Sequence, residues 1–269
     1  MCRVFEVSRS GFYAFLNHKP GKKENEDMKI KKLLPPVFEE HKKVYGPTRM
    51  SCILRKMGYG IGRTRTGRLM NECGLRQVAH RPFVITTVAG KEPPALPDLV
   101  NREFSADAPN RIWTADITYI WTLKGFVYLA VILDVFSRYI VGWSLRKDQT
   151  AVLVLSAFSM ALKRRGVPKE FVFHTDKGGQ FFSTNLRAQL SLLEIKQSMG
   201  STGDCFDNAV TESFNATLKK ECIYLEPIGD YDQAYRKVFD YIEMFYNPIR
   251  LHSYLGYQSP AEYEINQKT

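Results

Sequence analysis

The chain has 269 residues, of which 44% are hydrophobic and 25% charged, the composition of a globular protein with one large domain or two small ones. It has no uncharged apolar run of about 18 residues, which excludes a membrane span, and MCRVFEVSRSG lacks the features of a secretory signal. Its five cysteines form no CxxC pair, which excludes a disulfide framework and a zinc knuckle. The net charge of +10 lies in residues 1–100, which carry 19 Lys and Arg against nine Asp and Glu, whereas residues 101–269 carry 19 of each.

The basic segment has a helical pattern. Residues 24–43 are predicted to be helical with an interruption at Pro35-Pro36, because proline removes a backbone donor and clashes with the preceding turn. Two more helices are predicted at 47–57 and 63–73, separated by a glycine-rich turn at 58–62. Positive charge segregated on such a unit predicts that it binds a polyanion; the alternative is a basic, well-solvated helical region without a partner.

Two helices joined by a glycine-containing turn have the outline of a helix-turn-helix unit. The second helix of such a unit enters the major groove of DNA with its N-terminal end. The candidate DNA-contacting side chains near that end are Arg63, Arg65 and Arg68. Short helical hairpins with basic faces also occur in proteins that do not bind DNA, so both interpretations stay open at this point.

The pattern changes after a proline-containing segment. Residues 77–104 include VAGKEPPALPDLV, whose prolines and lack of periodicity predict a linker or extended arm. Beyond it, β-branched and aromatic residues predict three strands of an antiparallel meander, at 112–122, 126–134 and 139–145.

Helices and short strands then alternate along the chain. Helices are predicted at 151–165, 186–193 and 207–222, and short strands at 171–174 and 195–199. The first short strand has no adjacent hairpin partner, so we expect it to pair in parallel after the preceding helix crosses over. This order predicts an α/β domain with a ribonuclease-H-like, five-stranded mixed sheet, preceded by a small all-α helix-turn-helix-like domain.

Three acidic residues lie where this outline brings chain segments together. Asp116 is in the middle of a strand between bulky apolar groups, where a charge needs compensation. Asp176 follows a parallel strand at its carboxyl end, where open α/β sheets place ligand sites. Glu212 shares one face of the last predicted core helix with Asn215 and Lys219.

Three neighbouring carboxylates repel one another unless a cation lies between them. Magnesium prefers a few carboxylates plus water and substrate phosphate, and two divalent ions roughly 3.5–4 Å apart promote phosphodiester transfer. Each residue also has a separate structural interpretation. Asp116 can pair with an arginine, Asp176 can cap a helix, and Glu212 can be a solvated helical residue; the conjunction of the three favours a metal site.

The motifs that carry these carboxylates are WTADITYI, HTDKGGQF and DNAVTESFNATLKKE, with 35 residues between Asp176 and Glu212. Together they resemble the DDE catalytic core shared by retroviral integrases and bacterial insertion-sequence transposases. The spacing, and Lys219 seven residues after the glutamate, resemble the downstream-frame (OrfB) transposases of the group most like integrases. VYGPTRMSCILRKMGYGIGRTRTGRLMNECGL resembles the helical region before that core, and YNPIRLHSYLGYQSPAEYE resembles its carboxyl-terminal tail.

The resemblance implies metal-dependent DNA cleavage and strand transfer at the ends of an insertion sequence. It implies that the catalytic metal ligands are Asp116, Asp176 and Glu212, holding Mg²⁺ or Mn²⁺, with two ions per site when DNA is bound. It also implies a domain order of a DNA-binding region (1–76), the linker (77–104), the catalytic core (105–222) and a helical tail packed on the core (223–269).

Further DNA contacts are expected near the catalytic helix and in the tail. Lys219 is expected near a DNA phosphate, with Lys220 beside it on the helix. Arg250 and His252 lie on one side of the tail if it is extended, and the resemblance implies that the tail closes on the core and brings Arg250 toward DNA. The alternative is that Arg250 pairs only with a surface carboxylate.

The resemblance also implies partners and a location. The expected substrate is double-stranded DNA, which includes both the element ends and the target. The protein is expected to bind it as a homo-oligomer. The expected location is the bacterial cytoplasm, at the nucleoid and away from any membrane. The start at MCRVFEVSRSGFY resembles the downstream frame of a two-frame element, so fusion or partnership with an upstream-frame helix-turn-helix protein is expected.

Two other functions fit the same outline. One is a non-catalytic DNA-binding regulator on an integrase-like fold, and the other is a ribonuclease-H-like nuclease that acts on RNA–DNA hybrids. The intact acidic set disfavours the first, and the basic helical unit disfavours the second. His174 is either a substrate contact or a core histidine, while Cys205 and Phe206 form either an active-site gate or a hydrophobic anchor.

Overall fold

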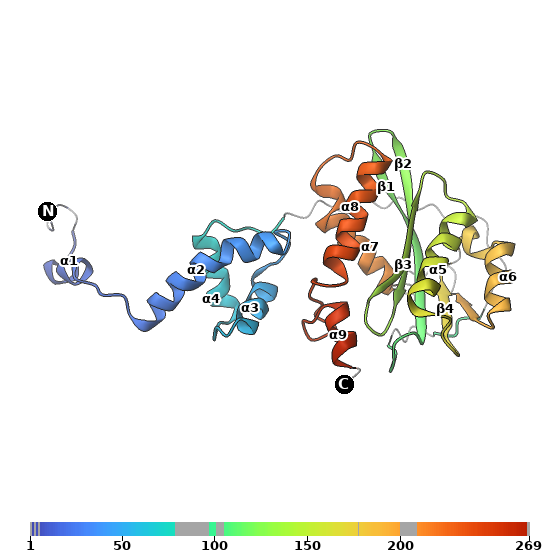
Figure 1. Ribbon diagram of the computed structural model, residues 1–269. Helices are drawn as coiled ribbons and strands as arrows, with labels where there is room; N and C mark the ends of the chain where they lie inside the picture. Colours follow the sequence, from blue (N-terminus) through green and yellow to red (C-terminus); the bar gives the residue numbers. More distant parts are fainter. Residues whose placement is uncertain are drawn as a thin grey trace. The chain divides into compact units, whose positions relative to one another are not determined.

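The computed structural model describes residues 2, 4, 6–78, 97–100, 105–176, 178–199 and 209–267 (Figure 1). The chain divides into two compact units, Met1–Gln77 and Val78–Thr269, each with its own core. In the part of the chain that is described, no helix is both long and apolar enough to cross a bilayer. Most of the predicted linker, and the predicted gate residues Cys205 and Phe206, fall outside the described residues.

The first unit is all helical. It consists of α1 (Arg9–Leu16), α2 (Lys22–Glu40), α3 (Pro47–Lys56) and α4 (Arg63–Glu72). Helices α3 and α4 lie at the predicted positions and pack on each other through a core that includes Met50, Leu54 and Leu69, and α4 also packs on α2. Helix α1 was not anticipated from the sequence; Ser8 caps it by accepting the N–H of Gly11 at 3.0 Å.

The predicted interruption at Pro35-Pro36 is wrong, because α2 runs continuously through both prolines. Buried Leu34, Val37 and Phe38 hold this part of the helix against the core. Proline 35 cannot donate to the carbonyl of Lys31, and the Cys73 thiol donates to that carbonyl instead, at 3.8 Å. Both prolines are exposed, so tertiary packing offsets the two lost helical bonds without burying an unpaired group.

The second unit is built on a five-stranded mixed sheet, as predicted. The strands lie in the order β3-β2-β1-β4-β5. Their bounds are β1 Ile112–Thr122, β2 Gly125–Asp134, β3 Ile140–Arg146, β4 Val172–Thr175 and β5 Lys196–Met199. The first three are antiparallel neighbours, whereas β4 runs parallel to both β1 and β5. The parallel pairing of β4 confirms the expected crossover through a helix.

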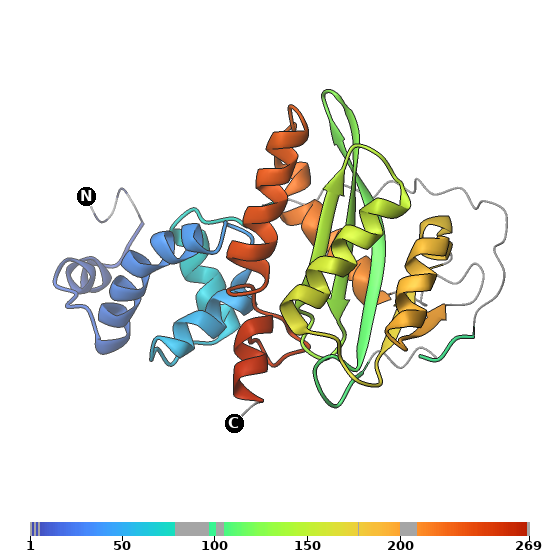
Figure 2. The same ribbon diagram turned by 45° about the vertical axis from the view of Figure 1, so that its right-hand side comes forward.

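Helices cover both faces of this sheet (Figures 1 and 2). On one face, α5 (Ala151–Arg165) and α6 (Thr184–Leu192) pack on a core that includes Trp113, Ala115 and Ile132. The opposite face carries α7 (Ala209–Glu221) and α8 (Tyr231–Tyr241). Shorter helical segments are η1 (Gly179–Phe182), η2 (Ile223–Leu225), a π-helical turn η3 (Ile242–Tyr246) and α9 (Pro260–Asn266).

The carboxyl-terminal segment completes the free edge of β3. The side chain of Asn247 accepts the N–H of Ile140 at 2.9 Å and donates to its carbonyl at 3.1 Å. Trp143 donates to Glu243 at 2.7 Å, and the Tyr231 hydroxyl donates to the carbonyl of Leu145 at 2.9 Å. The tail therefore pairs with backbone groups of Ile140 and Leu145 that face the free edge of β3, and it belongs to the second unit.

Strand β3 and helix α5 approach each other most closely at Gly142. A Cβ on Gly142 would lie less than 3.0 Å from the Ala157 carbonyl oxygen and 2.9 Å from the Ala161 nitrogen, both of them helix backbone. We expect Gly142→Ala to lower the free energy of unfolding by about 1–3 kcal/mol, which lowers Tm by roughly 2–4 °C for each kcal/mol. Thermal melts decide this, with Gly179→Ala as control, because a Cβ at Gly179 meets nothing within 4 Å. Equal melting temperatures for the two variants would contradict the close approach.

Candidate active site

Asp116 lies on β1 at the point where the pairing with β4 ends. Ala115 and Thr175 are the last paired residues, so Asp116 and Asp176 are the next positions on two adjacent parallel strands. The Asp116 carboxylate is half-buried and accepts two hydrogen bonds, from the N–H of Ile117 and from the Asn215 side-chain amide, each at 2.7 Å. Its position and both of its oxygens are therefore fixed by β1 and α7.

Glu212 reaches this neighbourhood from the first turn of α7. The Thr211 hydroxyl donates to the Thr114 hydroxyl at 2.6 Å in the interior, which fixes the start of α7 against β1. Glu212 itself is exposed, as is Asp176, which accepts the N–H of Gly178 at 3.0 Å. The fold thus brings the two strand carboxylates and the helix carboxylate to the carboxyl end of β4, where β1 and β4 separate.

The three carboxylates perturb one another electrostatically. Desolvation and the charge of Asp176, with a smaller contribution from Glu212, raise the pKa of Asp116 to about 7. Desolvation and Asp176 also raise the pKa of Glu212. Although Asp176 is exposed as a residue, desolvation of its carboxyl group raises its pKa as well. Among the described residues, none of these three groups forms an ion pair, although His174 acts electrostatically on Asp176 and Lys219 lies within electrostatic range of Asp116.

Lys219 lies at the border of this cluster. Its ammonium group is 4.8 Å from the centre of the Tyr119 ring, and the side chain is half-buried. Desolvation lowers the pKa of Lys219, while the charge of Asp116 opposes that shift. Lys220, the next residue on α7, is also half-buried, on a neighbouring face of the helix.

Comparisons with known proteins identify the fold that carries this cluster. Two family models described as integrase core domain match residues 106–205 and 193–260, and one described as HTH-like domain matches residues 25–83. Transposase InsF for insertion sequence IS3A, from Escherichia coli (strain K12), is 36% identical over 98% of this chain and 92% of its own length. The chain belongs to the insertion-sequence transposase family.

Two further similarities agree with this assignment. An insertion element IS600 uncharacterized 31 kDa protein from Shigella sonnei is 37% identical over 98% of this chain and 97% of its own length. A solved simian T-cell lymphotropic virus intasome in complex with a PP2A regulatory subunit matches 81% of this chain and 74% of the solved chain, with a TM-score of 0.50 and 16% identity. The second similarity concerns the fold alone. The chain is thus a DDE transposase with an integrase core and an HTH-like domain.

The structure places Arg250 of this transposase in the interior, which argues against the expected DNA contact. Its side chain is 5% exposed and donates twice to Glu221, at 2.8 and 2.7 Å. The same carboxylate accepts the Tyr241 hydroxyl at 2.7 Å. Half-buried His252 lies 3.4 Å from the Arg250 guanidinium and edge-on to the Tyr246 ring. Arg250 pairs with a carboxylate, as the alternative interpretation had it, but that carboxylate is only 12% exposed.

Two of the three arginines of α4 also have structural partners. Arg65 donates to Asp27 at 2.7 Å and to Glu26 at 2.6 Å, and Arg68 donates to Asp27 at 2.5 Å and to Glu72 at 2.7 Å. Arg65 is largely buried by these contacts, so its guanidinium holds α4 against α2. Arg63 is exposed at the first position of α4. Among the described residues, Arg63 is the one of these three predicted DNA contacts that is exposed and forms no ion pair.

His174 takes the second of its two predicted roles. It is 1% exposed on β4, and its Nδ1 lies 2.9 Å from the Ser198 hydroxyl of β5, so it is a hydrogen-bonded core histidine. Sequence reasoning noted that Asn215 shares a face with Glu212 but missed its bond to Asp116. The spacing of three residues from Glu212 was the available signal.

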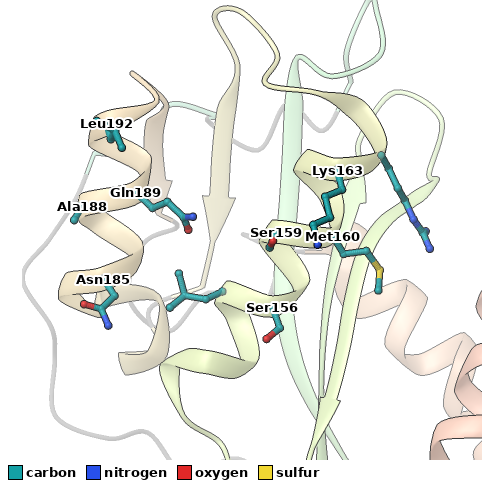
Figure 3. Close-up of a pocket in the computed structure, with 10 residues that line it drawn as sticks. Ser156, Ser159, Met160, Lys163, Asn185, Ala188, Gln189 and Leu192 are labelled. Atoms are coloured by element: carbon teal, nitrogen blue, oxygen red, sulfur yellow. The ribbon is translucent and has the colours of Figure 1, made fainter.

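A groove of about 970 Å³ lies between α5 and α6, away from the carboxylates (Figure 3). Ser156, Ser159 and Lys163 of α5 line one side of it. Asn185 and Gln189 of α6 line the other. None of the three carboxylates lines this groove.

The three carboxylates fit a hard divalent cation. They offer oxygen ligands only, and among the described residues none of them forms an ion pair. Among the described residues, no three His, Cys, Asp or Glu side chains are close enough to form a complete metal site. The carboxylates are therefore neighbours that fit a cation, without being arranged around one.

Proposed function

We propose that this transposase cleaves DNA at the ends of its insertion sequence and joins them to target DNA, with Asp116, Asp176 and Glu212 as its catalytic residues. The observation that carries the proposal is that these three carboxyl groups come together where β1 and β4 separate and α7 begins, with no ion pair to any of them among the described residues. Such crowding raises the free energy of the unliganded protein, and a bound cation relieves it. A purely structural cluster would be expected to form direct ion pairs with arginine or lysine.

The cation is Mg²⁺ or Mn²⁺, held by the three carboxylates, with two ions per site when DNA is bound. When bound, such ions neutralise charge on the attacking and leaving oxygens of a phosphodiester transfer. Asn215 holds one oxygen of Asp116 through its amide, and the N–H of Ile117 holds the other. These two bonds keep the carboxylate in one orientation, so the position of a ligand oxygen is set before substrate arrives.

The chain's basic side chains would position the DNA. Lys219, and Lys220 beside it, are the proposed phosphate contacts nearest the carboxylates, and Arg63 is the proposed contact of the HTH-like unit. Element ends and target are the proposed double-stranded substrates, bound in the cytoplasm by a homo-oligomer, with or without an upstream-frame helix-turn-helix partner. The structural roles of Arg65, Arg68 and Arg250 leave them outside this proposed set.

The test is cleavage and joining of a labelled DNA duplex that carries an element end, with and without Mg²⁺. We expect the wild type to be active only with the cation, and Glu212→Gln to lose activity by at least about a thousandfold because a ligand charge is lost. Its neighbour Ser213→Ala, which is also exposed, is the matched control. Mg²⁺ should also raise Tm of the wild type more than that of Glu212→Gln.

The competing functions give different results in the same assay. A DNA-binding regulator would bind the duplex and leave it intact in Mg²⁺. A ribonuclease-H-like nuclease would cut an RNA–DNA hybrid in preference to the duplex. Full activity of Glu212→Gln would remove Glu212 from the catalytic set.

A further inference from the structure

Three aromatic side chains form a cluster at the far end of the β1–β2 hairpin. We call Tyr119, Trp121 and Phe126 the aromatic shelf. Trp121 and Phe126 are cross-strand partners, and Tyr119 lies two residues before Trp121, so all three point to the same face of the sheet. Their rings meet edge to face, with centroids 4.7 Å apart for Trp121 and Phe126 and 5.4 Å apart for Tyr119 and Phe126.

The aromatic shelf continues the core face of the sheet past the helix that covers it. Trp113 and Ala115 point to this face and are buried under α5. The hairpin then extends beyond the end of α5 (Figure 2). Trp121 is 59% exposed and Phe126 48% exposed. Among the described residues, no element packs over these two rings, although adjacent aromatic side chains are costly to leave in water.

The tip of the hairpin is held in place, so the aromatic shelf is a fixed surface. The N–H of Leu123 donates to the carbonyl of Ile228 at 2.8 Å, and Lys124 pairs with Asp230 at 3.2 Å. Within the turn, the Thr122 hydroxyl donates to the carbonyl of Gly125 at 2.7 Å. A ligand that stacks on these rings would pay little ordering entropy, because the rings are already in place.

The aromatic shelf is connected to the catalytic cluster through Lys219. The Lys219 ammonium lies over the Tyr119 ring at 4.8 Å and within electrostatic range of Asp116. Trp121 follows Asp116 by five residues on the same strand, which is about 17 Å at roughly 3.3 Å per residue. The odd separation puts the two side chains on opposite faces of the sheet, so DNA that reaches both must pass the edge of β1 beyond its pairing with β4, where Lys219 lies. DNA advances about 3.4 Å per nucleotide along one strand, so this distance corresponds to about five stacked nucleotides.

We propose that the aromatic shelf stacks unpaired bases of the DNA that lie within about five nucleotides of the scissile phosphate. The proposal rests on the proposed function, since it assumes that DNA is bound at the carboxylates. Flat, fixed aromatic rings beside a cation match a nucleotide, whose base stacks while its phosphate meets the ammonium of Lys219. Paired bases inside a duplex present no free face, so the shelf selects a frayed or forked end.

Binding of forked DNA to the full-length protein tests this proposal. The probes are a duplex with unpaired arms and a fully paired duplex of the same sequence, in the same salt. Trp121→Ala should weaken binding of the forked DNA about 5- to 150-fold, the range that corresponds to about 1–3 kcal/mol for one stacked base. Binding of the paired duplex should change less than about twofold. Trp121→Phe, which keeps a flat ring, should retain most of the preference.

Tryptophan fluorescence gives a second readout. The chain has three tryptophans, and Trp113 and Trp143 are 0% and 2% exposed, so quenching by DNA reports Trp121. Forked DNA should quench the wild type, and Trp121→Phe should lose the quenching while it still binds. Phe239→Ala on α8, a partly exposed aromatic outside the shelf, is the matched control and should behave as the wild type. Because Trp121 is exposed, the variants should melt near the wild-type temperature.

The outcomes separate this proposal from the proposed function. If the wild type and Trp121→Ala bind forked DNA equally, the aromatic shelf does not stack bases, although the transposase function stands. If the wild type binds no DNA, both proposals fail. If Trp121→Ala leaves the forked-DNA preference unchanged but shifts the oligomeric state in sedimentation, the shelf is a protein-docking surface and the base-stacking proposal is overturned.

Discussion

Asp116→Asn should abolish strand transfer and at the same time stabilise the metal-free protein at pH 8. The activity is lost because the amide removes a charge from the proposed cation site. The stability rises because the carboxylate is desolvated and lies near Asp176 and Glu212, which raises its pKa to about 7. An amide at the same position removes this repulsion and keeps the acceptor for the N–H of Ile117. Asn215 can turn its otherwise unpartnered oxygen toward the new amide.

The pH dependence of this effect follows from the direction of the shift. The ordinary pKa of an aspartate in the unfolded chain is about 3.9, so the folded state holds the Asp116 proton more tightly. The stability that this proton contributes is fully present below about pH 4 and is lost as pH rises to about 7. Asp116→Asn should therefore melt like the wild type near pH 4. At pH 8 its free energy of unfolding should be higher by about 2–4 kcal/mol.

Thermal melts in EDTA across pH 4–8 measure this difference. The control is Asp240→Asn, an exposed aspartate on α8, which should show no such pH-dependent gain. Addition of Mg²⁺ should raise Tm of the wild type at pH 8 and leave Asp116→Asn nearly unchanged. A variant that is less stable than the wild type at pH 8 would show that the Asp116 charge is compensated in the folded protein.

Arg250→Met should destabilise the second unit by about 3–5 kcal/mol, because it leaves the Glu221 carboxylate in the interior without its cation. Hydrogen bonds to Glu221 outweigh desolvation and raise the pKa of Arg250, so the guanidinium stays charged. In a unit of this size the loss corresponds to a fall in Tm of roughly 6–20 °C. Arg250→Lys should also be destabilising, since an ammonium cannot reproduce the two-pronged contact.

A double variant distinguishes loss of an ion pair from loss of packing. Arg250→Met combined with Glu221→Leu removes the stranded charge, so it should recover part of the lost stability. Lys237→Met is a suitable control, because Lys237 pairs with exposed Glu226 and should shift Tm by no more than about 4 °C. If Arg250→Met has the wild-type Tm but binds DNA more weakly, the result would support the DNA contact of Arg250 that the sequence predicts.

Local sequence determined the elements of this fold. Runs of β-branched and aromatic residues placed β1, β2 and β3, and the apolar periodicity of 151–165 placed α5 at its observed bounds. These patterns are local, because a strand or helix must bury one face whatever lies opposite it. Asp116 and Asp176 were found in the same way, as polar interruptions at predictable points of strands, whereas Glu212 was singled out by the resemblance of its spacing to that of the transposase family.

Tertiary structure decided which charges are available to a ligand. Arg250, Arg65 and Arg68 look like DNA contacts in the sequence, yet their partners Glu221 and Asp27 come from distant segments. A charged side chain is available to a ligand only if it does not already pair with an opposite charge in the protein. Whether such a charge lies next to it depends on how the chain packs and not on spacing along the chain. The continuity of α2 through Pro35-Pro36 was decided in the same way, since burial of its apolar face outweighs a local penalty.

The aromatic shelf shows most clearly what the sequence determines and what tertiary packing determines. The sequence determined that Tyr119, Trp121 and Phe126 lie on one face of a hairpin, because side chains alternate along a strand. It did not determine that this face is uncovered, since the alternation is the same for the buried Trp113 and the exposed Trp121. The buried part of this face ends where α5 ends, because the hairpin is longer than the helix that covers it. Only the packing of helix on sheet therefore decides where the core ends and an exposed aromatic surface begins.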